Sequence, residues 1–187
     1  MAYNRTGGES IPQREIAIGG AFSVVGVLLA LHPQILTQLG FAGGFQFLLQ
    51  ASPVYVGVGA GILVLSITGH RITSRSSLVV LVVTLCVTAV WTTPLRSSVV
   101  TLVERYLLYI PAMTAFPSGV VAAKQQTRFL ASLVGGTTLT VLLAVVLIVN
   151  RSPRGPIGVF LIWSLVVVLI SSIPLLCAGW YLGSQSQ

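Results

Sequence analysis

The sequence predicts an all-α, polytopic transmembrane bundle on three observations. Hydrophobic residues make up 55% of the 187 residues, and charged residues only 7%, whereas soluble domains carry about 25% charged residues. The mean hydropathy is +0.96. The charged residues stand singly or in pairs between long apolar runs. A chain this poor in charge cannot cover its surface in water, so we expect lipid as the solvent and helices that satisfy their own backbone hydrogen bonds.

The chain length accommodates one transmembrane helical domain, which we expect at residues 16–183. A polar N-terminal tail, residues 1–15, precedes this domain, and a polar C-terminal tail, residues 184–187, follows it. The first apolar run, residues 16–31, is short for a bilayer core, which needs about 20 helical residues. Pro33 is expected to end this first helix or to kink it.

Residues 34–52 form an ambiguous segment after the first span. Its apolar residues recur at near-helical spacing, but Gln38, Gln46, Gln50 and three glycines interrupt them. An interfacial amphipathic helix is the first interpretation of this pattern. A glycine-rich re-entrant segment is the second.

The next two apolar runs predict the second and third spans at residues 54–69 and 77–91. Gly57 and Gly61 lie four positions apart in the second span, and this spacing allows two helices to approach closely. We therefore expect Gly57 and Gly61 to contribute to helix packing. Trp91 lies at the end of the third span, as residues of an interfacial aromatic belt do.

The stretch of residues 93–124 decides the number of spans. Residues 106–123 contain no charged residue and would extend about 27 Å as a helix, which just crosses a bilayer core. Pro111 and Pro117 are tolerated in lipid, because neighbouring helices can satisfy the carbonyl groups that proline leaves free. We expect six spans, with five possible if this stretch lies on the membrane surface.

The last two spans are the clearest in the sequence. Residues 129–149 form an uncharged run of the length that a bilayer requires. A turn-rich basic loop at residues 150–156 follows. Residues 157–182 form the last span, with Pro174 as an expected kink.

The distribution of basic residues predicts a multi-pass protein of the cell membrane with a cytoplasmic N-terminus. With six spans, one side carries Arg5, Arg14, Arg71, Arg75, Lys124 and Arg128, and the other carries Arg96, Arg151 and Arg154. The net charge of +7 fits loops that contact anionic headgroups. We expect no nucleic acid as a partner.

Arg96, Glu104 and Arg105 form the candidate functional polar cluster, because they are charged residues beside long apolar runs. An ionisable group inside a span costs several kcal/mol and is therefore a functional hypothesis. The three residues would then form a polar gate or contact a substrate. The alternative is that all three lie among the headgroups, with the arginines extended toward water.

The sequence supports no cofactor, metal site or catalytic set. Cys86 and Cys177 lie inside apolar runs and form no metal-binding or redox motif. His32 and His70 end the first and second spans, so an up-and-down pair of helices would separate them across the membrane. Ser118 has no histidine after it in the sequence to activate it as a nucleophile.

We therefore expect a non-catalytic subunit or scaffold of a membrane assembly, in contact with the lipid bilayer. Its expected protein partners are other membrane subunits or further copies of the chain. One alternative is a small transporter or channel that uses Glu104 and Arg105. A further alternative is a lipid-modifying membrane enzyme, which would need catalytic groups that this sequence does not supply.

Overall fold

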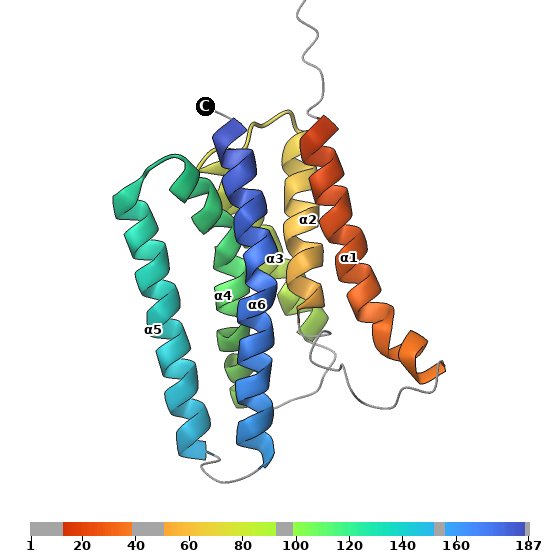
Figure 1. Cartoon of the computed structure of the whole chain (residues 1–187), viewed down its shortest axis with the longest axis vertical. Coiled ribbons are helices and arrows are strands. Elements are labelled where there is room, and N and C mark those ends of the chain that lie inside the picture. The colour runs from red at the N-terminus through yellow and green to blue at the C-terminus, as the bar shows by residue number, and fades with distance from the viewer. Residues whose placement is uncertain (1–12, 39–50, 93–98, 152–155, 186–187) are drawn as a thin grey trace, which may run out of the picture.

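The computed structural model describes residues 13–38, 51–92, 99–151 and 156–185, and these residues form six α-helices and no strand. The helices are α1 (Gln13–Gln38), α2 (Ser52–Ile67), α3 (Ser76–Thr92), α4 (Val99–Ala123), α5 (Thr127–Arg151) and α6 (Pro156–Gln185). They run up and down beside one another in one bundle (Figure 1). The prediction of an all-α fold is confirmed.

Three stretches of these helices are long and apolar enough to cross a membrane, namely Gln13–Leu31, Thr127–Val146 and Val168–Gln185. The shorter apolar stretches are Ser52–Ile67, Ser76–Trp91 and Tyr109–Ala123. The structure thus supports a helical membrane protein with three candidate spans. The count of six spans remains a proposal.

The first helix is longer than the expected first span. α1 begins at Gln13, inside the segment expected as a polar tail, and it continues past Pro33 to Gln38. A proline can be accommodated inside a helix at the cost of a bend, and the last turns of α1 bend away from the bundle (Figure 1). Most of the predicted interfacial or re-entrant segment, residues 39–50, lies outside the described residues.

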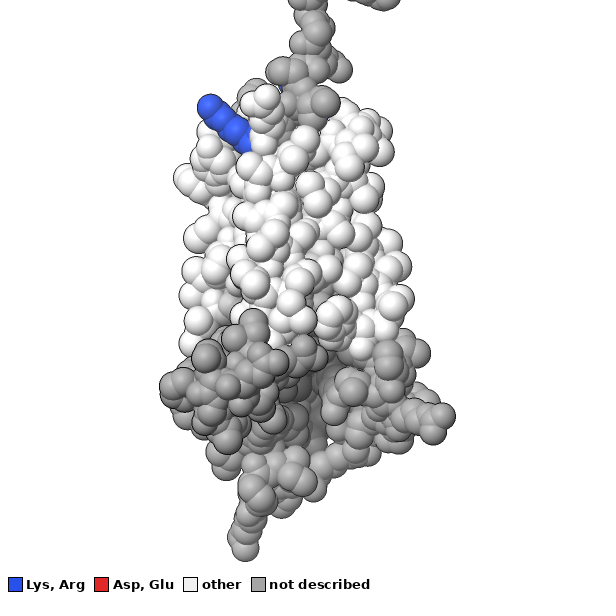
Figure 2. All heavy atoms as spheres, turned by 90° about the vertical axis from the view of Figure 1, so that its right-hand side faces the viewer, with Lys and Arg blue, Asp and Glu red and all other residues white. Residues whose placement is uncertain are grey.

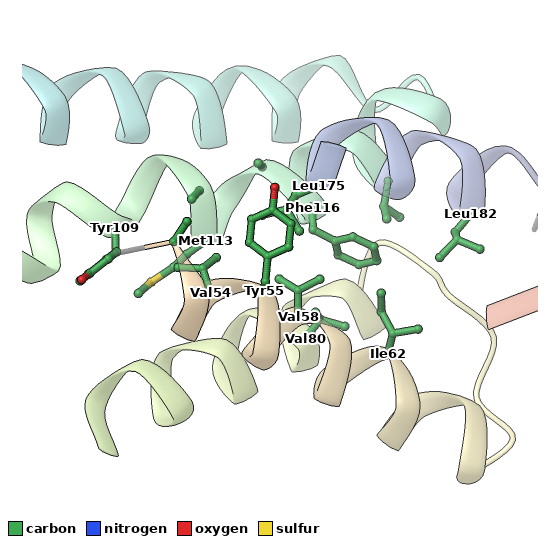
Figure 3. Packing of buried hydrophobic residues seen from close by; sticks show 14 of the residues in the cluster. Val54, Tyr55, Val58, Ile62, Val80, Tyr109, Met113, Phe116, Leu175 and Leu182 are labelled. Atoms are coloured by element: carbon green, nitrogen blue, oxygen red, sulfur yellow. The ribbon is translucent and has the colours of Figure 1, made fainter. Parts of the chain in front are cut away.

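The core lies among α2, α3, α4 and α6. Phe116 of α4, Leu175 of α6, Val58 of α2 and Val80 of α3 are fully buried. Their side chains converge with those of the neighbouring turns (Figure 3). α4 and α6 make the most extensive helix pair, whereas α1 packs mainly on α2 and α5 mainly on α4. α1 and α5 are therefore the two outer helices.

The outer surface of the bundle carries large aliphatic side chains. Exposed examples are Leu28 of α1, Val82 of α3, Leu139 of α5 and Ile170 of α6. An uncharged band covers the middle of the face shown in Figure 2, and a basic side chain lies near its upper end. A soluble monomer rarely exposes so large an apolar surface. This surface is typical of a protein that faces lipid.

Tyr55 of α2 connects three helices near the centre of the bundle. Its hydroxyl group donates a hydrogen bond of 2.6 Å to the backbone carbonyl of Ser171 on α6. Its ring lies 5.6 Å from the ring of Phe22 on α1, tilted by 58°. Ser171 is three residues before Pro174, where a proline weakens the backbone hydrogen bonding of α6. The carbonyl that Pro174 leaves without a helical donor is that of Ile170, four residues earlier. The Tyr55 hydroxyl group adds a hydrogen bond to the next carbonyl, that of Ser171, and so connects α2 to α6.

The substitution Tyr55→Phe is expected to destabilise the protein by about 1 kcal/mol, because it removes one buried hydrogen bond and keeps the ring. For a chain of this size the melting temperature should fall by about 2–4 °C. Thermal unfolding in detergent measures this change. Tyr181→Phe is the control, because Tyr181 is exposed. Equal melting temperatures for the two variants would contradict this role of the Tyr55 hydroxyl group.

Candidate functional site

The predicted polar cluster is only partly within the described residues. Arg96 lies outside them, and Glu104 and Arg105 belong to α4 with their side chains undescribed. The backbone of α4 is helical from Glu104 to Ala123, the residue before Lys124, which corresponds to about 29 Å at 1.5 Å per residue. A hydrocarbon core is about 30 Å thick. If Lys124 marks one membrane surface, Glu104 and Arg105 lie close to the other, as the headgroup alternative expects.

Gly57 and Gly61 lie on the side of α2 that faces α3. A methyl group at Gly57 would lie 2.7 Å from Cα of Thr84, and one at Gly61 would lie 2.9 Å from Cα of Val80. These distances leave no room for a side chain on either residue. The two glycines thus allow the backbones of α2 and α3 to approach closely.

The opposite side of α2 packs against α1 in a similar way. A Cβ atom at Gly59 would touch Oγ of Ser23 and would lie 2.6 Å from the carbonyl oxygen of Gly19. On α1, a Cβ atom at Gly26 would lie 2.7 Å from the backbone nitrogen of Val56. α2 therefore contacts both neighbours through small residues.

The closest approach joins α4 and α6, and sequence reasoning missed it. A Cβ atom at Gly119 would touch the carbonyl oxygen of Leu176, and one at Gly179 would touch the carbonyl oxygen of Phe116. A Cβ atom at Gly183 would lie 3.0 Å from Cα of Val120. Gly179 and Gly183 have the same four-residue spacing as Gly57 and Gly61, so the signal was present in the sequence.

Three buried hydroxyl groups in the described part of the bundle bind their own helix. Ser66 donates to the carbonyl oxygen of Ile62 at 2.9 Å. Thr84 donates to Val80 at 2.7 Å, and Thr88 donates to Thr84 at 2.8 Å. These bonds satisfy the hydroxyl protons within one helix, so these side chains pack as small groups and do not form a polar path.

A cavity of about 350 Å³ lies between α4, α5 and α6. It forms because α5 packs against α4 but scarcely against α6. Thr114 of α4 and Thr137 of α5 are joined across it by a hydrogen bond of 2.9 Å. Ser118 and Ser172 also line it, and the remaining lining is mainly aliphatic. This cavity combines several hydroxyl groups with an apolar wall.

The described charged side chains gather at one end of the bundle. A carboxylate oxygen of Glu15, near the start of α1, lies 3.4 Å from the Ser66 hydroxyl oxygen near the end of α2, as a second and more distant acceptor for the single Ser66 proton. Glu15 is also attracted by Arg71. The start of α1, the α2–α3 connection and the α4–α5 connection lie at the same end of the bundle (Figure 1). Lys124 and Arg128 flank the latter connection. Basic groups at one end are suited to anionic headgroups.

The histidine and cysteine side chains that the structure describes form no metal-binding cluster. His70 is exposed beside the α2–α3 connection, and the side chain of His32 is outside the described part of the chain. Cys86 and Cys177 are exposed on α3 and α6. Among the side chains that the structure describes, no three His, Cys, Asp or Glu residues lie close enough to hold a metal ion.

The fold and the apolar outer surface indicate a helical membrane protein. Comparison with known proteins found no match for this chain among family models, curated proteins or solved structures. The functional argument therefore rests on the helices, the contacts between them and the cavity.

Proposed function

We propose that this chain is a non-catalytic subunit or scaffold of a membrane assembly. The strongest support for this proposal is the way in which the helices pack in the described interior. Glycine contacts bring α2 against α1 and α3, and α4 against α6. Buried hydroxyl groups such as those of Ser66, Thr84 and Thr88 bind their own helices. An interior of this kind supports a rigid frame better than a water-filled path or a reaction centre.

We further propose six spans, with both ends of the bundle domain on the cytoplasmic side. Helices α2 and α3 contain 16 and 17 residues, or about 24–26 Å of helix, which a locally thinned bilayer can accommodate. Arg14, Arg71, Arg75, Lys124 and Arg128 lie at or near one end of the bundle. Basic residues favour the cytoplasmic side.

Labelling of single cysteines tests this topology on α5. In a background with Cys86 and Cys177 replaced by serine, we expect a membrane-impermeant maleimide to label Asn150→Cys on intact cells. Gln126→Cys, at the other end of α5, should react only after the cells are permeabilised. Labelling of both cysteine variants on intact cells would contradict a membrane-spanning α5. Labelling of Gln126→Cys alone on intact cells would contradict the proposed orientation of the bundle.

The alternative of a small transporter or channel that uses Glu104 and Arg105 has less support. Charges that couple to transport are expected near the middle of the membrane. The helical distance from Lys124 favours positions near a membrane surface for both residues. Glu104→Gln should therefore leave solute flux through reconstituted protein unchanged.

Purification from native membranes in mild detergent tests the subunit proposal. We expect a stoichiometric second membrane protein, or a defined oligomer of this chain, on size-exclusion chromatography with mass spectrometry. A monomer without partners, in detergent and in nanodiscs drawn directly from the membrane, would contradict the proposal.

A further inference from the structure

Ser118 differs from the other buried hydroxyl residues of the bundle. It is only 7% exposed and lines the cavity between α4, α5 and α6. Among the residues that the structure describes, none forms a hydrogen bond with its side chain. Thr84 and Thr137, by contrast, donate to the carbonyl group four residues earlier. An unpaired hydroxyl group in apolar surroundings costs about 1–3 kcal/mol, so Ser118 is a group that a ligand can satisfy.

The neighbouring hydroxyl groups determine what such a ligand must carry. Thr137 donates to the carbonyl of Leu133 at 2.7 Å, and Thr114 lies 2.9 Å from both the carbonyl of Ile110 and the Thr137 hydroxyl group. The two threonine protons are thus used within the protein, and only acceptor lone pairs remain. Ser118 still offers a proton. A ligand hydroxyl group matches this set, because it donates and accepts at once.

Spacing on α4 allows one ligand group to reach two of these hydroxyl groups. Thr114 and Ser118 are four residues apart on one helix, so their Cβ atoms lie about 5–6 Å apart on the same face. Both line the cavity. A hydroxyl group between them can accept a hydrogen bond from Ser118 and donate one to Thr114.

The depth of the cavity indicates that its ligand comes from the lipid. Thr114 is ten residues before Lys124, and Thr137 is nine residues after Arg128, or about 14–15 Å along each helix. This is about half the thickness of a hydrocarbon core. Because α5 and α6 scarcely touch, a molecule dissolved in the bilayer can enter between them.

The size and charge of the cavity favour a small, uncharged occupant. Among the described residues, no charged side chain lines the cavity, and an unpaired charge in apolar surroundings is very costly. The volume lies at the lower end of the range for small-molecule sites.

We propose that this cavity binds an uncharged, lipid-soluble alcohol of medium chain length. Its hydroxyl group lies between Ser118 and Thr114, and its hydrocarbon chain packs against Val134, Leu169 and Leu176. The site does not depend on the subunit function proposed above. It adds a binding activity that a scaffold or a transporter can each possess.

Photolabelling of the purified full-length chain in nanodiscs tests the site. The probe is dodecanol with a diazirine in its chain, and the matched control probe is the same chain without the hydroxyl group. We expect saturable labelling of α4–α6 peptides by the alcohol, competed by free 1-dodecanol and not by dodecane. Ser118→Ala should weaken the competition about 3- to 10-fold, the contribution of one hydrogen bond.

A pair of bulky substitutions on α5 separates binding in the cavity from labelling of the outer surface. Thr138 lines the cavity and Thr140 does not. Thr138→Phe should abolish saturable labelling, and Thr140→Phe should leave it intact. Equal labelling by both probes on the native chain, or unchanged competition in Ser118→Ala, would overturn the proposal. Crosslinks from the cavity to a second protein chain would also overturn it.

Discussion

Gly179→Ala is expected to lower the melting temperature by about 6–12 °C, the largest effect of any single methyl group that we predict. The added Cβ atom would touch the carbonyl oxygen of Phe116 and lie 3.1 Å from its carbonyl carbon and 3.2 Å from the backbone nitrogen of Val120. All three are backbone atoms, so no side chain can rotate away. The helices α4 and α6 must separate, at a cost of about 3 kcal/mol, the upper end of typical overpacking penalties.

The same substitution at Gly136 should act in the opposite direction. A Cβ atom at Gly136 of α5 meets no atom within 4 Å. Alanine in a helix is about 0.5–1 kcal/mol more favourable than glycine, so the melting temperature of Gly136→Ala should stay unchanged or rise slightly. Thermal unfolding of both variants in one detergent makes this comparison. A similar melting temperature for both would refute close packing between α4 and α6.

Contacts between small residues also explain which side chains the bundle buries. Gly57, Gly119 and Gly179 lie at helix contacts, whereas Leu139 is 69% exposed and Ile170 is 61% exposed. In lipid, large aliphatic side chains gain little by turning inward, and close backbone approach contributes more. Because the small residues lie between the helices and the large aliphatic side chains lie outside, the same chain would expose a large apolar patch in water.

The sequence predicted the helical segments well, because apolar length alone determines them. The expected spans at residues 54–69, 77–91, 129–149 and 157–182 each correspond to one helix of the structure. Residues 106–123 lie within α4 (Val99–Ala123). The start of α1 was less predictable, because polar residues such as Gln13 can occupy the first turn of a helix near the membrane surface.

The helix contacts and the cavity were less predictable from the sequence. A Cβ atom added at Gly135 or Gly136 would meet no neighbouring atom, whereas one added at Gly179 would meet the backbone of α4. The presence of a glycine therefore does not by itself identify a helix–helix contact. The spans are apolar on all sides, and periodicity then cannot assign the face that meets protein. Ser118 is distinguished only by a missing partner, which depends on how three helices pack. The positions of Arg96, Glu104 and Arg105 remain predictions.

Gly59→Leu should detach α1 and leave the rest of the bundle folded. A Cβ atom at Gly59 would lie 2.6 Å from the backbone nitrogen of Ser23 and 2.6 Å from the carbonyl oxygen of Gly19. α1 packs mainly on α2, whereas the core lies among α2, α3, α4 and α6. The strain therefore acts on an outer helix that can open by itself.

Hydrogen–deuterium exchange of the full chain measures this opening helix by helix. A penalty of about 1–3 kcal/mol should accelerate exchange in α1 peptides by about 5- to 150-fold. Exchange in peptides of α4 and α6 should stay at the native rate. Gly20→Leu is the matched control, because a Cβ atom at Gly20 on the same helix meets nothing within 4 Å. Faster exchange in every helix of Gly59→Leu would show that α1 is an integral part of the core, and unchanged exchange in α1 would show that its contact with α2 tolerates a side chain.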